Sequence, residues 1–385
     1  KLGAVKAPRH LQCSHRPACP GCPRFGVPGL APSARATLAK LAERAGLPEP
    51  ALHEGAALDF RVRARLAVRG RAGQPKIGIF QLGTHRVVHI PQCRIHHPVI
   101  NEVSEQVRQA LAAHRLPLYS DSAHAGRVRY LQIVVQRQSG SAQLVVVTND
   151  PAYSGLDAFF SDVAERLGSR LHSLFWNGQP ERSNAVLGGA WHRFAGPQAL
   201  EESFAGVRLF YPPDAFGQSH LNLAERISER VSVFVPQGAR VVEFYAGVGA
   251  LGLPLVPRIE SLTLNEIGEG SLRGLSLGIE ALPEVVRPRV CVVPGAAGDA
   301  ARLVTEDVDV VIVDPPRKGL DEPLLSRLVE NPPRRLIYVS CGLDALVRET
   351  ESLLSRGAFA LSALEAFALF PYTEHVETLA VFDRV

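Results

Sequence analysis

The chain has 385 residues, of which 46% are hydrophobic and 21% are charged. This is longer than one ordinary domain, and the composition excludes a disordered, collagenous or coiled-coil protein. No apolar run approaches the roughly 20 residues that a membrane helix needs, and the first residues lack the apolar stretch of a signal peptide. We therefore expect a soluble, cytoplasmic protein of two or three domains.

Charge is divided unevenly along the chain. Residues 1–150 contain 21 Lys and Arg against 8 Asp and Glu, a net charge of +13, whereas the rest of the chain has a net charge of −9. A basic front half predicts a polyanion-binding module, because Lys and Arg that neutralise phosphates release counterions. The densest cluster consists of Arg61, Arg63, Arg65, Arg69 and Arg71. The first three alternate with apolar residues, so a strand there would present its arginines on one face. Nucleic acid is the favoured partner, and a merely solvated sheet face is the alternative.

The first element in chain order is a cysteine-rich loop. Cys13, Cys19 and Cys22 fall within ten residues in the Pro- and Gly-rich stretch CSHRPACPGCPRFG, and Cys93 can close a four-sulfur site. Because a cytosolic chain keeps its thiols reduced, such clustering favours a metal over a disulfide. Four thiolates suit either a [4Fe–4S] cluster or structural zinc. Zinc remains an alternative because histidines, which are also zinc ligands, lie near the cysteines in the sequence: His10, His15, His96 and His97.

The segment that follows the loop reads as a mixture of helices and strands. A helical stretch at 33–47 precedes three strand-like runs separated by Gly-containing turns, as in a β-meander. An amphipathic helix is then expected from Asn101 to His114, followed by two more strands and a helix around Leu156–Leu174. The expected strands are 59–70, 76–83, 85–90, 129–138 and 142–150.

After about residue 205 short apolar runs alternate with helical stretches. The runs are ARVVEFYAG, SLTLNE, RVCVVPG, DVVIVDPP and RLIYVSC. They fit buried parallel strands of an open α/β sheet, in which ligands bind outside the carboxyl ends of the strands. Glu243, Glu266, Asp314 and Cys341 all fall at or near such ends. The pattern therefore predicts a binding site at one edge of the sheet.

Two loops at these ends indicate the kind of ligand. EFYAGVGALGLPL has glycines that allow close backbone approach, and Glu266 stands 23 positions after Glu243, where an acidic residue can bind ribose hydroxyls. Without G-K-[ST], the loop favours a dinucleotide or S-adenosylmethionine over ATP. The rigid Asp314-Pro315-Pro316 turn is typical of methyltransferases that present a flat base, and a proline-terminated strand is the alternative interpretation.

Two cysteines and a C-terminal acidic segment are candidates for chemistry. Cys341 ends an apolar run, where a thiol can face a cleft and act as a nucleophile if positive charge lowers its pKa. A small buried hydrophobe is the alternative role for Cys341, and we interpret Cys291 as core filler. The segment FPYTEHVETLAVF offers a general base at Glu374, His375 or Glu377.

Seven segments resemble, in this order, those of the RNA uridine-C5 methyltransferases that make 5-methyluridine in ribosomal and transfer RNA. They are CSHRPACPGC, KIGIFQLGTHRVVHIPQC, FGQSHLNLAERI, EFYAGVG, DPPRKG, YVSC and FPYTEHVE. The resemblance covers nearly the whole chain. It implies a Rossmann-like catalytic domain at 205–385, preceded by a cysteine-rich loop at 1–35 and a smaller, basic α+β RNA-binding domain at 36–204.

The resemblance also implies roles for individual residues. Uracil C5 is a poor nucleophile, so a thiolate must first attack C6 to make C5 electron-rich. The implied [4Fe–4S] ligands are Cys13, Cys19, Cys22 and Cys93. The implied S-adenosylmethionine-binding residues are Gln218, Tyr245, Glu266 and Asp314, the nucleophile is Cys341, and the general base is Glu377 rather than Glu374.

The favoured function is methylation of uridine C5 in 23S ribosomal RNA by a monomer, because the cluster cysteines resemble the ribosomal branch of the family. The same reaction on transfer RNA is the first alternative. A non-catalytic RNA-binding or assembly factor with a decayed cofactor pocket is the second, and a zinc-stabilised RNA-binding protein is the third. The second is motivated by departures from the family pattern at Ala250, Ala296 and Gly342, and Ala246 and His220 also depart from that pattern.

Overall fold

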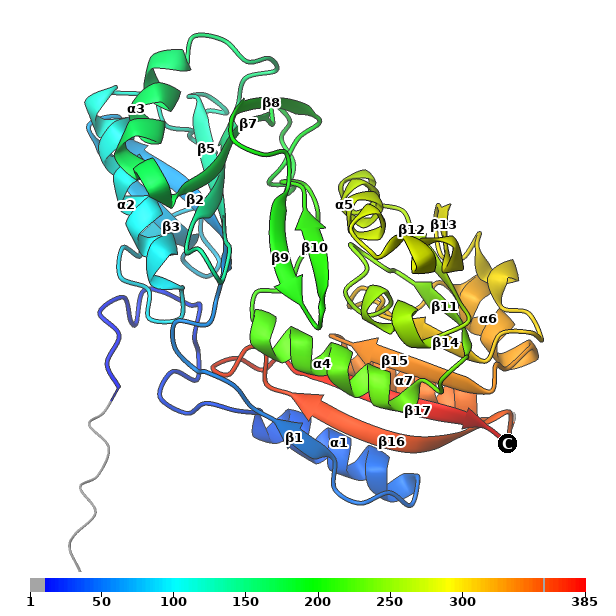
Figure 1. Cartoon of the computed structure of the whole chain (residues 1–385). Helices are drawn as coiled ribbons and strands as arrows, with labels where there is room; N and C mark the ends of the chain where they lie inside the picture. Colours follow the sequence, from blue (N-terminus) through cyan, green and yellow to red (C-terminus); the bar gives the residue numbers. More distant parts are fainter. Residues whose placement is uncertain (1–10, 356) are drawn as a thin grey trace, which may run out of the picture.

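The computed structural model describes residues 11–355 and 357–385, so His10 and the rest of the first ten residues lie outside the described part. Two β-sheets form separate layers, and a two-stranded ribbon lies between them (Figure 1). The ribbon consists of β9 (Leu200–Phe204) and β10 (Val207–Tyr211). The described helices include none that is long and apolar enough to cross a membrane.

The front sheet has seven strands in the order β4-β3-β2-β5-β6-β7-β8. Neighbours are antiparallel except for β6 and β7, which are parallel. Helices α2 (Pro98–Ala113) and α3 (Asp157–Leu167) cover the face turned away from the second sheet (Figure 1). The strands are β2 (Arg63–Arg71), β3 (Gln74–Phe80), β4 (Val87–His89), β5 (Val128–Val135), β6 (Ala142–Thr148), β7 (Leu171–Gly178) and β8 (Ala190–Ala195).

The predicted helix at 156–174 is wrong in its second half. Helix α3 ends at Leu167, and Gly168 caps it with a positive φ of 48°, a conformation that glycine adopts without steric cost. A short 3₁₀ turn, Gly168–Arg170, then leads into β7. The apolar run Leu174–Trp176 therefore forms a buried strand beside β6 instead of another helical turn.

The arginines of β2 and the residues before it alternate as predicted, but two of them are not surface charges. Arg63 and Arg69 are only 8% and 7% exposed. Arg69 donates two hydrogen bonds to the Asp121 carboxylate, at 2.6 and 2.9 Å, and one to each of two backbone carbonyls. Arg65 and Arg71 remain exposed. A uniformly solvated basic face is therefore a wrong prediction for this strand.

The second sheet has eight strands in the order β1-β16-β17-β15-β14-β11-β12-β13. The five neighbouring strands β15, β14, β11, β12 and β13 are parallel to one another, which confirms the α/β prediction for the chain after about residue 205. β17 pairs antiparallel with both β15 and β16. The strands are β1 (Ala51–His53), β11 (Arg240–Phe244), β12 (Ser261–Glu266), β13 (Val290–Pro294), β14 (Val310–Val313), β15 (Arg335–Ser340), β16 (Phe359–Phe367) and β17 (Glu377–Arg384).

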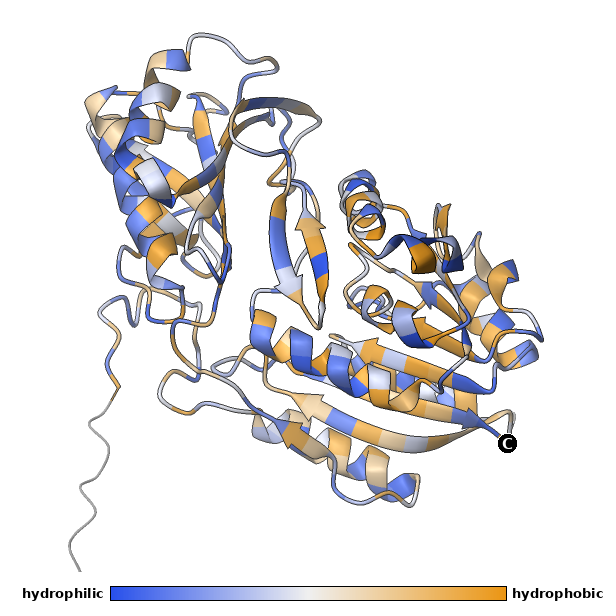
Figure 2. Ribbon diagram, viewed as in Figure 1, coloured by the Kyte–Doolittle hydropathy of each residue, from blue (hydrophilic) through white to orange (hydrophobic). Residues whose placement is uncertain are grey.

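Helices cover both faces of this sheet, and its strands are largely hydrophobic whereas the helices are mixed (Figure 2). One face carries α1 (Pro32–Arg44), α6 (Glu322–Glu330) and α7 (Leu343–Ser355). The other carries α4 (Leu221–Phe234), α5 (Glu269–Glu280) and the 3₁₀ helix η2 (Leu253–Arg258). Two further 3₁₀ helices are η3 (Glu284–Arg289) and η4 (Ala301–Leu303).

Two details differ from the expected organisation. Helix α1 and strand β1 belong to the second sheet, although their residues fall mostly in the segment 36–204, because the buried face of α1 shares one apolar core with strands of that sheet and β1 pairs with β16. Cys291, interpreted as core filler, is exposed, because β13 is the edge strand of the sheet. Segments that precede and segments that follow the front sheet in the sequence thus both contribute to the second sheet.

Candidate active site

A cavity of about 560 Å³ opens at the carboxyl ends of the parallel strands of the second sheet. It lies beside the switch point between β11 and β14, where the chain order along the sheet reverses. All six residues predicted for catalysis and cofactor binding line this one cavity: Gln218, Tyr245, Glu266, Asp314, Cys341 and Glu377. The sequence separates the first and last of them by more than 150 positions.

Cys341 and Glu377 face each other across two neighbouring strands. The register of the antiparallel pair β15 and β17 matches Ser340 with Thr378, so Cys341 and Glu377 occupy the next opposed positions. Directly opposed residues of an antiparallel pair project to the same face of the sheet. Both side chains line the cavity, whereas Glu374 and His375 are exposed and do not line it. Among the three candidate bases, only Glu377 therefore reaches the cavity.

The carboxylates at these strand ends resist ionisation. Burial raises the pKa of Glu377 to about 8, aided by Asp314 and opposed by Arg317. Burial also raises the pKa of Asp314 to about 7, and that of Glu243 well above its usual range. Glu377 is only 3% exposed, and its Oε2 has no hydrogen-bond partner among the described residues. An acid with a pKa near 8 is suited to proton transfer near neutral pH.

Cys341 is half-buried, and its thiol has only a long contact of 3.9 Å to the carbonyl oxygen of Pro315. Burial, followed by Glu377 and Asp314, raises the pKa of Cys341 to about 11. Arg317 acts in the opposite direction, since a guanidinium favours the thiolate. A reactive thiolate here therefore depends on positive charge near Cys341.

Glu266 organises the glycine loop. Its Oε2 accepts a hydrogen bond of 2.7 Å from the Gly247 backbone N–H, and its Oε1 accepts from the N–H groups of Ile267 and Gly268 at 2.9 and 2.6 Å. Tyr245 and Gly247 have positive φ angles of 60° and 58°, which turn the loop sharply at the end of β11. The carboxylate of Glu266 is thus held at the cavity wall by main-chain donors.

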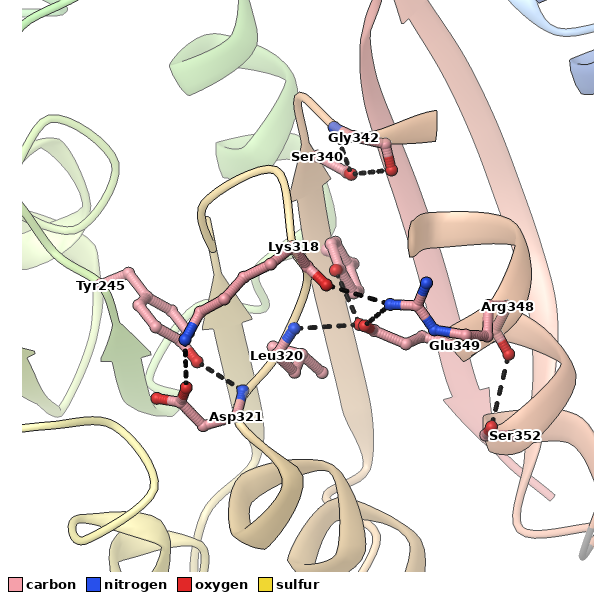
Figure 3. Close-up of polar contacts among 10 residues, drawn as sticks. Tyr245, Lys318, Leu320, Asp321, Ser340, Gly342, Arg348, Glu349 and Ser352 are labelled. Atoms are coloured by element: carbon pink, nitrogen blue, oxygen red, sulfur yellow. Dashed lines mark hydrogen bonds and ion pairs between the residues drawn. The ribbon is translucent and has the colours of Figure 1, made fainter. Parts of the chain in front are cut away.

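The loop after β14 is braced from below by a buried carboxylate (Figure 3). Glu349 on α7 accepts hydrogen bonds from the Leu320 N–H at 3.2 Å and the Tyr338 hydroxyl at 2.9 Å. The Tyr245 hydroxyl accepts from the Asp321 N–H at 3.0 Å, and Lys318 forms an ion pair with Asp321 at 3.1 Å. These contacts fix the loop that presents Asp314 and Arg317 to the cavity.

The sequence interpretation missed Arg317 and Phe370, and it gave no individual role to Glu243. Arg317 is the single positively charged side chain among the described residues that line the cavity. Glu243 is 1% exposed and its Oε2 has no partner in the described chain. Phe370 forms part of the wall and lies under the Arg61 guanidinium, 5.5 Å from its ring centre. A charged residue after a strand-end turn, as in DPPR, was the signal available for Arg317.

Two departures from the family pattern have a local explanation. His220, where Asn is usual, caps α4 by accepting a hydrogen bond from the Leu223 N–H at 3.4 Å, and its other ring nitrogen contacts the Ala56 carbonyl. Gly342, where Asn is also usual, lies against the Arg317 backbone: a Cβ there would be 2.5 Å from the Arg317 carbonyl oxygen. Nothing in the structure explains Ala250 and Ala296.

The four clustered cysteines gather at one place beside this site. Cys22 and Cys93 pack in the same small apolar cluster, and Cys19 and Cys93 border the front-domain core. Burial raises the pKa of Cys22 to about 12, with further increases from Cys93, Cys19 and Cys13. No group of three or more Cys, His, Asp or Glu side chains within residues 11–355 and 357–385 is arranged closely enough to hold a single metal ion.

The parallel sheet, its switch-point cavity and the glycine loop define an S-adenosylmethionine-dependent methyltransferase. The family model for tRNA (uracil-5-)-methyltransferase matches residues 299–385. An uncharacterized RNA methyltransferase of Protochlamydia amoebophila is 35% identical over 97% of this chain and 98% of its own length. One from Nostoc is 29% identical over 86% and 72%. The chain belongs to the RNA uracil-C5 methyltransferase family.

A solved structure extends the similarity to the fold of nearly the whole molecule. The tRNA (uracil-54, C5)-methyltransferase of Pyrococcus abyssi, in complex with S-adenosyl-L-homocysteine, superimposes with a TM-score of 0.75. The match covers 91% of this chain and 83% of that one at 22% sequence identity. Both the catalytic sheet and the β-rich front domain therefore belong to a known fold.

Proposed function

We propose that this enzyme methylates C5 of a uridine in 23S ribosomal RNA through a covalent bond between Cys341 and C6 of the base. The observation that carries the proposal is the opposed placement of Cys341 and Glu377 in one cavity with four candidate cofactor-binding residues. A nucleophile that reaches C6 and a base that reaches C5 of the same flat ring are what this reaction requires.

The first chemical step belongs to Cys341. Its thiolate attacks C6 of uracil, forming an S–C6 bond and moving the C5–C6 electron pair toward C4 as an enolate. Arg317, which favours the thiolate, also offers the positive charge that the enolate needs. S-adenosylmethionine supplies the sulfonium methyl group that C5 then takes.

The second step belongs to Glu377. As a carboxylate it removes the remaining proton from C5, the C5–C6 double bond re-forms, and the bond to Cys341 breaks. The thiolate is released and the proton stays on Glu377. A raised pKa of about 8 keeps this carboxylate basic enough to accept a carbon-bound proton.

Gln218, Tyr245, Glu266 and Asp314 are the residues that we assign to the cofactor and the base beside it. Glu266 stands one strand after the glycine loop, where a carboxylate recognises ribose hydroxyls. The loop itself permits close approach, because Gly247 leaves its backbone uncovered at the cavity. Removal of the Glu266 carboxylate, as in Glu266→Gln, is expected to weaken cofactor binding in a calorimetric titration.

RNA reaches the cavity as an unstacked nucleotide, because a base inside a helix cannot expose both faces of C5 and C6. The face of the front sheet opposite α2 and α3 offers exposed charge and aromatic surface for the rest of the RNA. Arg65, Arg71, Lys76 and Arg193 are exposed on it, and Trp191 is half-buried among them. Because these side chains would contact RNA phosphates, we expect the affinity for RNA to fall as the salt concentration rises.

We further propose that Cys13, Cys19, Cys22 and Cys93 hold a [4Fe–4S] cluster. Four thiols without a carboxylate are a soft donor set that suits iron–sulfur ligation. A zinc ion, with bonds of about 2.3 Å, would draw its four sulfurs within about 4 Å of one another, whereas a cluster spaces them more widely. The cluster supplies a structural cross-link. Broad absorbance near 400 nm and stoichiometric iron support this proposal, and zinc in a colourless protein contradicts it.

Transfer RNA is the second candidate substrate, favoured by the tRNA (uracil-54, C5)-methyltransferase of Pyrococcus abyssi and by the matching tRNA (uracil-5-)-methyltransferase family model. The deciding experiment supplies labelled S-adenosylmethionine with unmodified 23S RNA and, separately, with unmodified transfer RNA, followed by nucleoside analysis. Label in 5-methyluridine from 23S RNA supports the first proposal, and label only in transfer RNA replaces it with the second. Cofactor binding without transfer to either RNA contradicts both.

A further inference from the structure

We infer that Arg24 positions the general base, by tying the cysteine-rich loop to the segment that leads into Glu377. This inference rests on the proposed role of Glu377 and extends it to a residue outside the cavity. Residues 368–376 lie between β16 and β17 and form neither helix nor strand. This segment contributes Phe370 to the cavity wall and leads directly into Glu377. Its position must therefore be fixed by contacts from elsewhere in the chain.

Arg24 provides most of those contacts. Its backbone N–H donates to the Tyr372 carbonyl at 3.0 Å, and its Nη1 donates to the Thr373 carbonyl at 3.2 Å. The same guanidinium donates to the carbonyls of Gly29 and Leu30, each at 3.1 Å. The Arg24 side chain is 15% exposed. One planar group thus joins the cysteine-rich loop, the start of α1 and the segment before the base.

Packing around Arg24 makes these segments one unit. The ring of Phe25 lies 5.0 Å from that of Tyr372, centre to centre. Tyr372 is buried in the small apolar cluster that Cys22 and Cys93 border. On the other side of the segment, the Arg61 guanidinium lies over the Phe370 ring. The cysteine-rich loop therefore packs directly against the chain that carries the base, and none of the Arg24 hydrogen bonds within the described residues reaches the segment that carries Cys341.

This asymmetry predicts which step depends on Arg24. Cys341 directly follows Ser340, the last residue of the central strand β15, which pairs with Thr378 of β17. Glu377 is the first residue of β17, where its backbone pairs with Phe367 of β16, and the segment that Arg24 contacts runs directly into it, so movement of that segment displaces the carboxylate. Without Arg24, formation of the S–C6 bond and methylation of C5 continue, while removal of the C5 proton slows. The methylated, covalently bound RNA then accumulates.

The test compares Arg24→Ala, Arg24→Lys and Arg16→Ala with wild type and Glu377→Gln, using the full chain and the RNA that wild type methylates. Arg16 is the matched control, because the one hydrogen bond of its guanidinium among the described residues goes to the Phe25 carbonyl, at 3.3 Å, within the same loop. The readouts are kcat, KM for RNA, the SDS-resistant protein–RNA adduct, and metal content per chain.

For Arg24→Ala we expect kcat to fall about 10- to 100-fold with KM for RNA within about threefold, the adduct to accumulate as in Glu377→Gln, and metal content to match wild type. Arg24→Lys should recover part of kcat, since an ammonium reaches one carbonyl rather than three. Arg16→Ala should behave as wild type. Wild-type kcat in Arg24→Ala, or a fall in kcat without adduct, or with loss of metal, overturns the inference.

The same set separates the inference from the function on which it rests. If wild type forms no 5-methyluridine, or if Glu377→Gln turns over normally without adduct, the proposed chemistry is wrong and the role of Arg24 falls with it. If wild type is active and Glu377→Gln accumulates adduct while Arg24→Ala resembles wild type, the chemistry stands and only the inference fails.

Discussion

The buried charge of Arg69 in the front sheet and the buried carboxyl groups at the cavity of the catalytic sheet have opposite surroundings. In the front sheet, the Arg69 guanidinium is hydrogen-bonded to Asp121 and to two carbonyls, and it lies about 5 Å from the rings of Phe80, Tyr119 and Tyr130. In the catalytic sheet, buried oxygens of Glu243 and Glu377 have no partner among the described residues. The Arg69 site satisfies its buried charge, and the cavity leaves buried carboxyl oxygens without partners.

The contrast indicates where the molecule keeps its reactivity. A buried charge with a full set of partners has nothing left to offer a ligand, so it serves stability and orientation. A buried carboxyl group without partners costs free energy, and a fold that retains it does so where a ligand or a proton will meet it. We therefore expect substitutions in the cavity to change chemistry and substitutions of paired arginines to change stability.

The largest expected effect is that of Cys341→Ala. Without the thiolate no S–C6 bond forms, and turnover should fall by at least about 10⁴-fold while cofactor binding stays close to wild type. Labelled methyl transfer and calorimetry measure the two properties. Cys291→Ala is the matched control, because Cys291 is an exposed cysteine on the edge strand β13, and it should leave activity within about twofold. Residual turnover above about 1% in Cys341→Ala would exclude covalent catalysis.

Glu377→Gln should lower turnover by about 10²- to 10⁴-fold and, unlike most substitutions at buried sites, stabilise the protein at alkaline pH. The pKa of Glu377 is raised in the fold, so the stability associated with its neutral form is present below pH 4.5 and is lost as pH rises through about 8. Glutamine cannot ionise. Thermal unfolding at pH 5 and pH 9 should show a gain for the variant of about 1–3 kcal/mol at the higher pH only. Equal stability of the variant and wild type at pH 9 would mean that the pKa of Glu377 is not raised in the fold.

Arg69→Ala tests the other side of the comparison. It leaves Asp121 without its bidentate partner and removes the cation from three aromatic rings. We expect the free energy of unfolding to fall by about 3 kcal/mol, with kcat nearly unchanged below the melting temperature. Arg71→Ala, two residues further along β2 and exposed, should change stability by less than about 0.5 kcal/mol. Denaturant unfolding of both variants measures the difference, and equal losses would remove the distinction between paired and free charge.

The sequence alone predicted the catalytic sheet well, because buried parallel strands leave continuous apolar runs ended by special residues. Where it was wrong, the cause was a tertiary contact. The helix expected to continue to Leu174 ended early because β6 offers Leu174–Trp176 a parallel partner. Cys291 is exposed because no strand follows β13 at the sheet edge. Neither edge position nor long-range pairing leaves a mark in local sequence.

In the candidate site, too, local sequence revealed some residues and not those whose role depends on tertiary contacts. Strand-end residues such as Asp314 and Cys341 were found by their position after apolar runs. Arg24 was not, because its importance comes from carbonyl groups nearly 350 positions away in the chain, and carbonyls carry no sequence signal. Arg63 and Arg69 were placed on a basic face by alternation, which cannot distinguish a charge facing water from one facing Asp121.

The smallest expected effect concerns the single cation of the acidic cavity. Arg317 lowers the pKa of both Cys341 and Glu377, so Arg317→Gln should raise both values and reduce the thiolate and carboxylate forms at neutral pH. We expect turnover to fall about 3- to 10-fold at pH 7.5 and to recover as pH rises above 9, because one pKa unit corresponds to a tenfold change in the ionised fraction. The matched control is Lys318→Gln, since Lys318 pairs with Asp321 outside the cavity and should not shift the pH–rate profile. A uniform loss across all pH values would assign Arg317 to binding RNA, and the cavity would then contain no cation that activates its nucleophile.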